Sequence, residues 1–128
     1  MESDEEEMDR RMSDEMTITE LIADAHRTAV DKGWWDDDPE LDRSFGTAIA
    51  LIHSEASEAL EEYRDGRKYD EIYYREDGKP EGIPVEFADV VIRIADQAGQ
   101  RGIPLLRAIV EKLAFNKTRE HRHGNKKC

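Results

Sequence analysis

The sequence predicts an all-α fold in which four main helices form a bundle behind an acidic tail. Apolar residues recur at helical spacing in four segments, and residues that typically cap helices bound these segments. No segment shows the polar–apolar alternation of a half-buried strand. A chain of 128 residues suits one domain with one core. We therefore expect a helical domain over residues 16–128.

Residues 1–15 are expected to form a disordered, self-repelling tail. They hold eight acidic side chains against two arginines, so they carry −6 of the chain's net charge of −12. The remaining body is only moderately acidic and can therefore hold an ordinary core.

The first helix is expected to run from about Thr17 to Lys32. Thr17 and Glu20 match a capping box, in which each side chain accepts a hydrogen bond from the other residue's backbone N–H. Gly33 is expected to end this helix.

The second and third helices are expected over residues 44–64 and 84–98. Ser44 or Asp42 can cap the second helix. Residues 67–83 are polar and broken by glycine and proline, so we expect at most a short turn there. The third helix is apolar on almost every side, which marks it as central.

A fourth helix is expected from Pro104 to about Phe115. Gly99 and Gly102 should bracket the tight turn in front of it, and a basic stretch, residues 116–128, follows it. The side chains expected to face the core are Leu105, Leu106, Ile109, Leu113 and Ala114.

Composition and charge argue against several classes of protein. The net acidity disfavours a nucleic-acid-binding surface, so no stable nucleic-acid binding is expected. One cysteine, Cys128, excludes an internal disulfide framework and fits a reducing compartment. The sequence contains neither a secretory signal nor an apolar run long enough to cross a membrane. A cytoplasmic protein without membrane association is therefore expected.

Two pairs of carboxylates stand three residues apart on the second and third helices. Glu55 and Glu58 share one helix face, with Glu62 one turn further on, and Glu86 and Asp89 share another. Asp89 is flanked by apolar residues, and an unpaired carboxylate in such surroundings needs a cation, a metal or a proton. Two acidic stripes on neighbouring helices suggest one shared metal.

Hard divalent cations such as Mg²⁺ take oxygen ligands. No histidine stands three residues beyond these acids and no cysteine is nearby, which disfavours di-iron and zinc sites. The sequence therefore predicts a Mg²⁺ site, with Mn²⁺ also possible, held by Glu55, Glu58, Glu86 and Asp89. The alternative is that the acids of the second helix form a solvated face paired with lysines.

The carboxylate pairs belong to a longer pattern that covers nearly everything from about Thr19 to Lys127. It comprises Lys32-Gly33-Trp34-Trp35, Glu55-x-x-Glu58, Glu86-x-x-Asp89, Ala114-Phe115-Asn116-Lys117-Thr118-Arg119 and Arg122-His123-Gly124. This pattern resembles the MazG-like all-α nucleoside triphosphate pyrophosphohydrolases. The resemblance implies a metal-dependent helical bundle, usually a homodimer or homotetramer, that hydrolyses a (d)NTP to the monophosphate and pyrophosphate.

On this resemblance, the four carboxylates would hold Mg²⁺ and act as the catalytic residues. A metal-activated water would attack the α phosphorus in line. The chain departs from the family pattern at Ser54, where a further glutamate often stands. The number of bound metals and the identity of a base therefore stay open, with Glu62 as a possible replacement.

Basic and aromatic residues are the candidates for substrate binding. The residues after the fourth helix would reach back to the phosphates or sugar, arginine through forked contacts and lysine as a point charge. One tryptophan would stack on the base or else close the end of the first helix, and a histidine beside the acidic stripe would contact base or phosphate or be structural. These candidates are Asn116, Lys117, Arg119, Arg122, Trp35 and His53.

Two other functions stay open. The chain could be a non-catalytic helical module whose acidic surface binds a basic partner, or the same metal clamp could act on another nucleotide pyrophosphate. A third helix that is apolar on all sides also leads us to expect a homo-oligomer.

Overall fold

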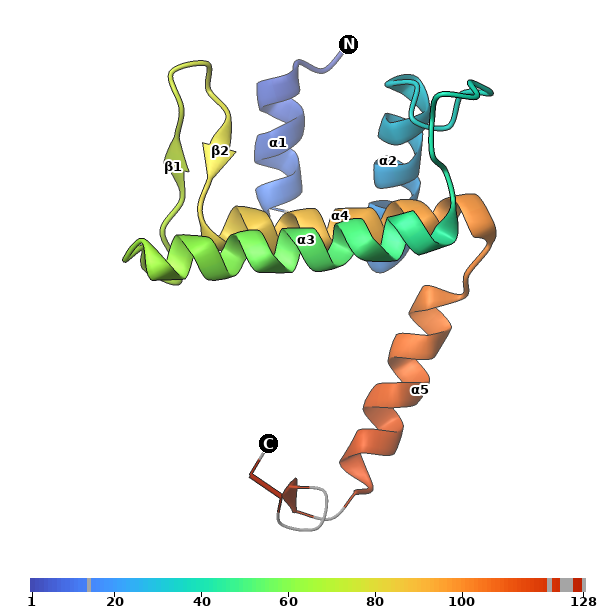
Figure 1. Ribbon diagram of the computed structural model, residues 1–128, viewed down its shortest axis with the longest axis vertical. Helices are drawn as coiled ribbons and strands as arrows, with labels where there is room; N and C mark the ends of the chain where they lie inside the picture. The colour runs from blue at the N-terminus through green and yellow to red at the C-terminus, as the bar shows by residue number, and fades with distance from the viewer. Residues whose placement is uncertain (14, 120, 123–125, 128) are drawn as a thin grey trace.

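The computed structural model describes residues 1–13, 15–119, 121–122 and 126–127. His123, Gly124 and Cys128, named above, lie outside these described residues. Helices dominate the fold, so the prediction of an all-α class is confirmed (Figure 1). The elements are α1 (Asp4–Ser13), α2 (Ile18–Asp31), α3 (Phe45–Arg64), β1 (Tyr73–Tyr74), β2 (Pro80–Glu81), α4 (Ile83–Arg101) and α5 (Leu105–Lys117).

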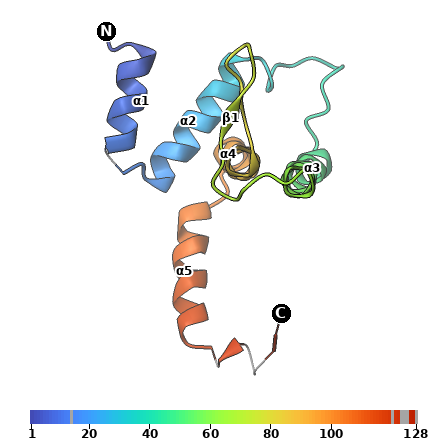
Figure 2. The same cartoon turned by 90° about the vertical axis from the view of Figure 1, so that its left-hand side faces the viewer.

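Helices α3 and α4 form the centre of the molecule. They lie side by side and antiparallel, and Figure 2 shows both nearly end-on. Helix α2 crosses α4, so α4 contacts both of the other packed helices, as expected for the central one. The β1–β2 hairpin stands where α3 ends and α4 begins, whereas α5 projects away from this layer (Figure 1).

The starts of α2 and α3 follow from local capping chemistry. The Thr17 Oγ1 accepts a hydrogen bond from the Glu20 backbone N–H at 3.1 Å, and Glu20 Oε1 accepts one from the Thr17 N–H at 3.1 Å. The Ser44 Oγ accepts from the Thr47 N–H at 3.3 Å. These bonds satisfy N–H groups that a helix start leaves without partners, so both predicted starts are confirmed.

The prediction of a turn at Gly99 is wrong, because α4 continues through this residue to Arg101. Gly99 lies against His26 of α2, and a Cβ atom at Gly99 would stand 2.7 Å from the His26 Cβ. The glycine therefore permits a close approach of two helices. Gly102, with φ of 64°, ends α4 in the left-handed conformation.

The prediction of a disordered N-terminal tail is also wrong, because Asp4–Ser13 form α1. The Ser3 Oγ accepts a hydrogen bond from the Glu6 N–H at 3.1 Å. Four acidic residues in the first turn lie where the helix dipole favours negative charge. Among the described residues, α1 has no extensive contact with another element.

The hairpin was not expected from the sequence. Its strands have two residues each and pair antiparallel, with Tyr73 opposite Glu81 and Tyr74 opposite Pro80. Strands of this length are too short to show alternation, so the segment has the sequence character of a polar loop. The hairpin matters because it carries Glu81 to the end of α3.

Helix α5 does not pack against the other helices as expected. None of its residues is buried, and Leu106, Val110, Leu113 and Phe115 are about half exposed. The turn at Gly102 directs α5 away from α3, so only three of the four main helices pack within the described chain. The buried apolar residues are mostly small: Ala25, Ala59, Ile83, Ala95 and Ala98. Among the described helices, none combines the length and apolar character needed to cross a membrane.

Candidate metal centre

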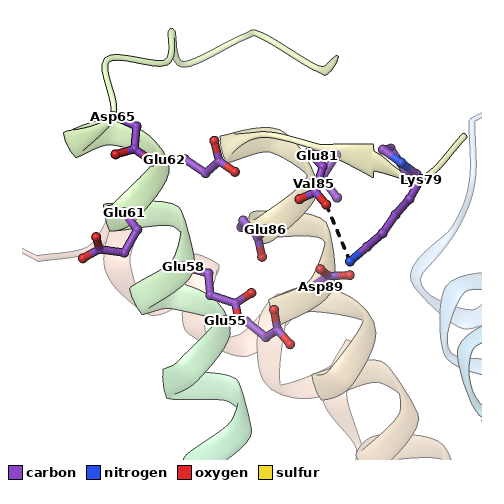
Figure 3. Close-up of a pocket in the computed structure, with 11 residues that line it drawn as sticks. Glu55, Glu58, Glu61, Glu62, Asp65, Lys79, Glu81, Val85, Glu86 and Asp89 are labelled. Carbon is purple, nitrogen blue, oxygen red and sulfur yellow. Dashed lines mark ion pairs between the residues drawn. The ribbon is translucent and has the colours of Figure 1, made fainter. Parts of the chain in front are cut away.

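An acidic cleft of about 480 Å³ lies between α3 and α4, beside the β1–β2 hairpin (Figure 3). Helix α3 contributes its carboxylates from successive turns, α4 contributes two from its first two turns, and the hairpin contributes one carboxylate and one ammonium group. The lining residues are Glu55, Glu58, Glu61, Glu62, Asp65, Lys79, Pro80, Glu81, Val85, Glu86 and Asp89.

Two triads of carboxylates meet inside this cleft and share Glu86. In the first triad, one ligand oxygen from each of Glu55, Glu86 and Asp89 lies within 4.8 Å of the others. In the second, oxygens of Glu62, Glu81 and Glu86 meet the same limit. The structure thus brings together three of the four predicted metal ligands. The spacing of three residues puts Glu86 and Asp89 on one face of α4, whereas α3 contributes only Glu55 to the first triad.

Glu86 is the most buried carboxylate of the cleft. Its side chain is only 6% exposed, and its Oε2 has no hydrogen-bond partner. Burial raises the pKa of Glu86 to about 8. A hydrogen bond with Glu58, the negative charges of Glu58 and Asp89, and a hydrogen bond with Glu55 add to the effect. Without a cation, the cleft therefore favours a proton on this group at neutral pH.

The sequence pattern singled out Asp89 as the buried acid, and this is wrong. Asp89 is only partly buried, and the apolar residues Phe87 and Val91 near it in sequence are themselves 62% and 47% exposed. Burial still raises the pKa of Asp89, and the charge of Glu55 adds to this, whereas Arg93 and Lys79 oppose it.

Glu58 has a different environment from the other predicted ligands. Its side chain is exposed, and it lies beside Glu86 without belonging to either triad. Glu61 points away from the cleft centre in Figure 3 and pairs with Arg64 at 2.8 Å.

Arg93, Lys79 and Arg75 border the acids, and the sequence patterns had singled out none of them. The Arg75 Nη1 lies 3.7 Å from Glu81 Oε1. The Nε and Nη2 of Arg93 lie 3.0 and 2.9 Å from Glu55 Oε1. The Lys79 Nζ lies 3.6 Å from Glu81 Oε1 (Figure 3). Arg93 follows Asp89 by four residues, so helical spacing alone would have placed it on the same face.

The alternative, in which the acids of α3 form a solvated face paired with lysines, does not describe Glu55 and Glu62. Glu55 and Glu62 are partly buried, and their partners are Arg93 and Tyr73. The Tyr73 hydroxyl donates to both oxygens of Glu62 at 2.8 and 3.0 Å. The hydrogen bond to Glu62 raises the pKa of Tyr73.

Trp35 belongs to a second polar cluster, between α2 and α4. Its indole Nε1 donates to Asp96 Oδ1 at 2.9 Å, and the His26 Nδ1 lies 3.1 Å from the same oxygen. These contacts hold the turn after α2 against α4. Trp34 is 65% exposed, so the two adjacent indoles have different environments.

The other predicted substrate-binding residues do not line the cleft. Asn116 and Lys117 end α5, which projects away from the acids, and Arg119 lies 5.7 Å from the Phe115 ring. The side chains of Arg122 and His53 are exposed, and neither lines the cleft. Within one chain, the predicted phosphate-binding cations and the acids are therefore separate.

Comparisons with known proteins give no relative: no family model, curated protein or solved structure matches this chain. The metal-ligand atoms that converge in the cleft are all carboxylate oxygens, which suit a hard divalent cation better than zinc or copper. A buried carboxylate oxygen without a partner is the atom that such a cation would satisfy. The residues present fit Mg²⁺ or Mn²⁺.

Proposed function

We propose that this protein is a Mg²⁺-dependent nucleoside triphosphate pyrophosphohydrolase, which converts a (d)NTP and water into the monophosphate and pyrophosphate. The observation that carries the proposal is Glu86 Oε2, which is buried without a partner among converging carboxylates. A buried group of this kind is costly unless a ligand satisfies it, and such groups are concentrated at functional sites.

In this proposal, Glu55, Glu86 and Asp89 hold the cation. When bound, Mg²⁺ supplies the positive charge that lets a polyphosphate approach an acidic cleft, and it makes a water molecule a stronger nucleophile. Glu58 is exposed beside this triad, so its carboxylate can take the proton that water loses. The chain needs no nucleophilic serine or cysteine for this chemistry.

We further infer that a second copy of the chain covers α5. One face of α5 exposes Leu106, Val110 and Leu113, and α4 exposes Phe87 and Val91. Monomeric proteins rarely leave such large apolar areas uncovered. The charges also favour a second copy of this chain as the partner of α5, because the end of α5 is basic and the cleft is acidic.

A dimer built this way would bring the basic end of one α5 toward the cleft of the partner copy. That arrangement would reconcile the predicted substrate-binding role of Asn116, Lys117, Arg119 and Arg122 with their separation from the acids in one chain.

The test is product analysis by ³¹P NMR after incubation with each (d)NTP and Mg²⁺. The proposal predicts monophosphate and pyrophosphate in equal amounts, and loss of turnover in Glu86→Gln. Glu61→Gln is the matched control, because Glu61 is 63% exposed and pairs with Arg64 outside the triads. Release of single phosphate, or no turnover with any nucleotide, would refute the proposal. Metal-independent binding of a basic protein would instead favour the non-catalytic module.

A further inference from the structure

Arg93 contacts the metal triad without being a possible ligand. It lies one turn beyond Asp89 on α4, and its guanidinium crosses to Glu55 on α3. Both contacting nitrogens approach the same oxygen, Glu55 Oε1, at 3.0 and 2.9 Å. Glu55 is one of the three residues whose oxygens converge within 4.8 Å, so the arginine and a cation would compete for one carboxylate.

Glu55 and Arg93 differ in their exposure to solvent, so Arg93 can leave the ion pair more easily than Glu55. The Glu55 side chain is 12% exposed, whereas that of Arg93 is 41% exposed. Glu55 is therefore held in the cleft, while the guanidinium lies at its edge and can turn toward solvent or a ligand. A guanidinium and a divalent cation a few ångströms apart repel each other, so binding of the cation weakens the ion pair.

We propose that Arg93 exchanges partners: it neutralises Glu55 in the metal-free protein and, once a divalent cation occupies the triad, binds the phosphates of the nucleotide. This inference rests on the proposed function. The arginine side chain is suited to the second role, because its planar fork matches phosphate oxygens. Among the described residues that line the cleft, Lys79 is the sole basic one, and both Lys79 and Arg75 already pair with Glu81, at 3.6 and 3.7 Å.

A permanent structural ion pair is the competing explanation, and the second of two measurements separates it from partner exchange. The first is Mn²⁺ affinity without nucleotide, measured by isothermal titration calorimetry. Arg93→Gln removes the competing cation, so Mn²⁺ should bind about three- to tenfold more tightly than to the wild type. The second is affinity for a non-hydrolysable α,β-methylene triphosphate at saturating Mn²⁺, which should fall about tenfold or more in the same variant.

Arg27→Gln is the matched control. Arg27 also pairs with a carboxylate, that of Asp24, at 3.7 Å, but on the surface of α2, where the Arg27 side chain is 68% exposed. Its substitution changes net charge equally, and both affinities should stay at the wild-type value. Arg93→Lys keeps the charge without the fork, so it should show wild-type Mn²⁺ affinity and weaker nucleotide binding; it also serves if Arg93→Gln does not fold.

The fall in nucleotide affinity is the signature. Loss of a positive charge beside the triad tightens metal binding in either case, whereas an arginine that stays paired with Glu55 makes no contact with the phosphates that its substitution could remove. Mn²⁺ affinity that is unchanged or weaker in Arg93→Gln would overturn the inference while leaving the proposed function intact. Nucleotide affinity that is unchanged would do the same. A wild-type protein that binds no Mn²⁺ at all would overturn the proposed function and this inference together.

Discussion

Replacement of Glu86 by glutamine should change how the stability of the metal-free protein depends on pH. Glu86 is only 6% exposed, and the pKa of its carboxyl is raised from 4.5 to about 8, mainly by burial. Between these two values the folded protein keeps a proton that the unfolded chain has lost. The stabilisation from the protonated form is therefore complete below about pH 4.5 and is lost as the pH rises through about 8.

The size of this effect follows from the shift. At 1.36 kcal/mol per pKa unit, a shift from 4.5 to about 8 corresponds to at most about 5 kcal/mol. Coupling to Glu58 and Asp89 spreads part of this over the cluster, so we expect about 2–5 kcal/mol. Glutamine has nearly the same shape and stays neutral, so Glu86→Gln should match the wild type near pH 5 and exceed it by this amount near pH 9.

Urea denaturation in the presence of EDTA, followed by helical circular dichroism, measures this difference in the free energy of unfolding. Glu61→Gln should follow the wild-type profile, because Glu61 is exposed and paired with Arg64. Parallel pH profiles for Glu86→Gln and the wild type would refute the claim that burial raises the pKa of this carboxyl.

Three further predictions test other parts of the structure. Mn²⁺ affinity should rise between about pH 6 and pH 8, because Glu86 must lose its proton to bind the cation, and calorimetry in two buffers should detect the released proton; a flat profile would contradict this. Gly99→Ala should destabilise the fold by about 1–3 kcal/mol, since the new Cβ would lie 2.7 Å from that of His26, whereas Gly46→Ala, with nothing within 4 Å, should be neutral or stabilising in thermal denaturation. Leu113→Glu should lower the mass measured by light scattering to that of one chain, and an unchanged mass would count against the proposed role of α5.

Local chemistry explains what the sequence predicted well. The cap at Thr17 depends on residues within one turn, and so does the cap at Ser44, so both could be recognised without knowledge of the fold. The spacing of acids along α3 and α4 is local in the same sense. It was enough to aim Glu55, Glu86 and Asp89 at one point once the two helices lay side by side.

Long-range arrangement explains what the sequence analysis missed. Glu81 reaches the cleft only because a hairpin with two-residue strands folds back beside α3, and strands this short have no period to detect. Burial of Glu86 rather than Asp89 depends on which face of α4 meets α3. The exposure of α5 was missed because its apolar pattern indicates an interface without saying whether the partner is in the same chain.

A crystal soaked in Mn²⁺ and examined by anomalous diffraction would test the central claim most directly. We expect an anomalous peak between α3 and α4, with oxygens of Glu55, Glu86 and Asp89 at metal–oxygen distances of about 2.1 Å, as for a Mg²⁺-like ion. A map with no peak in the cleft, or with Mn²⁺ only at surface carboxylates such as Glu111, would contradict this claim.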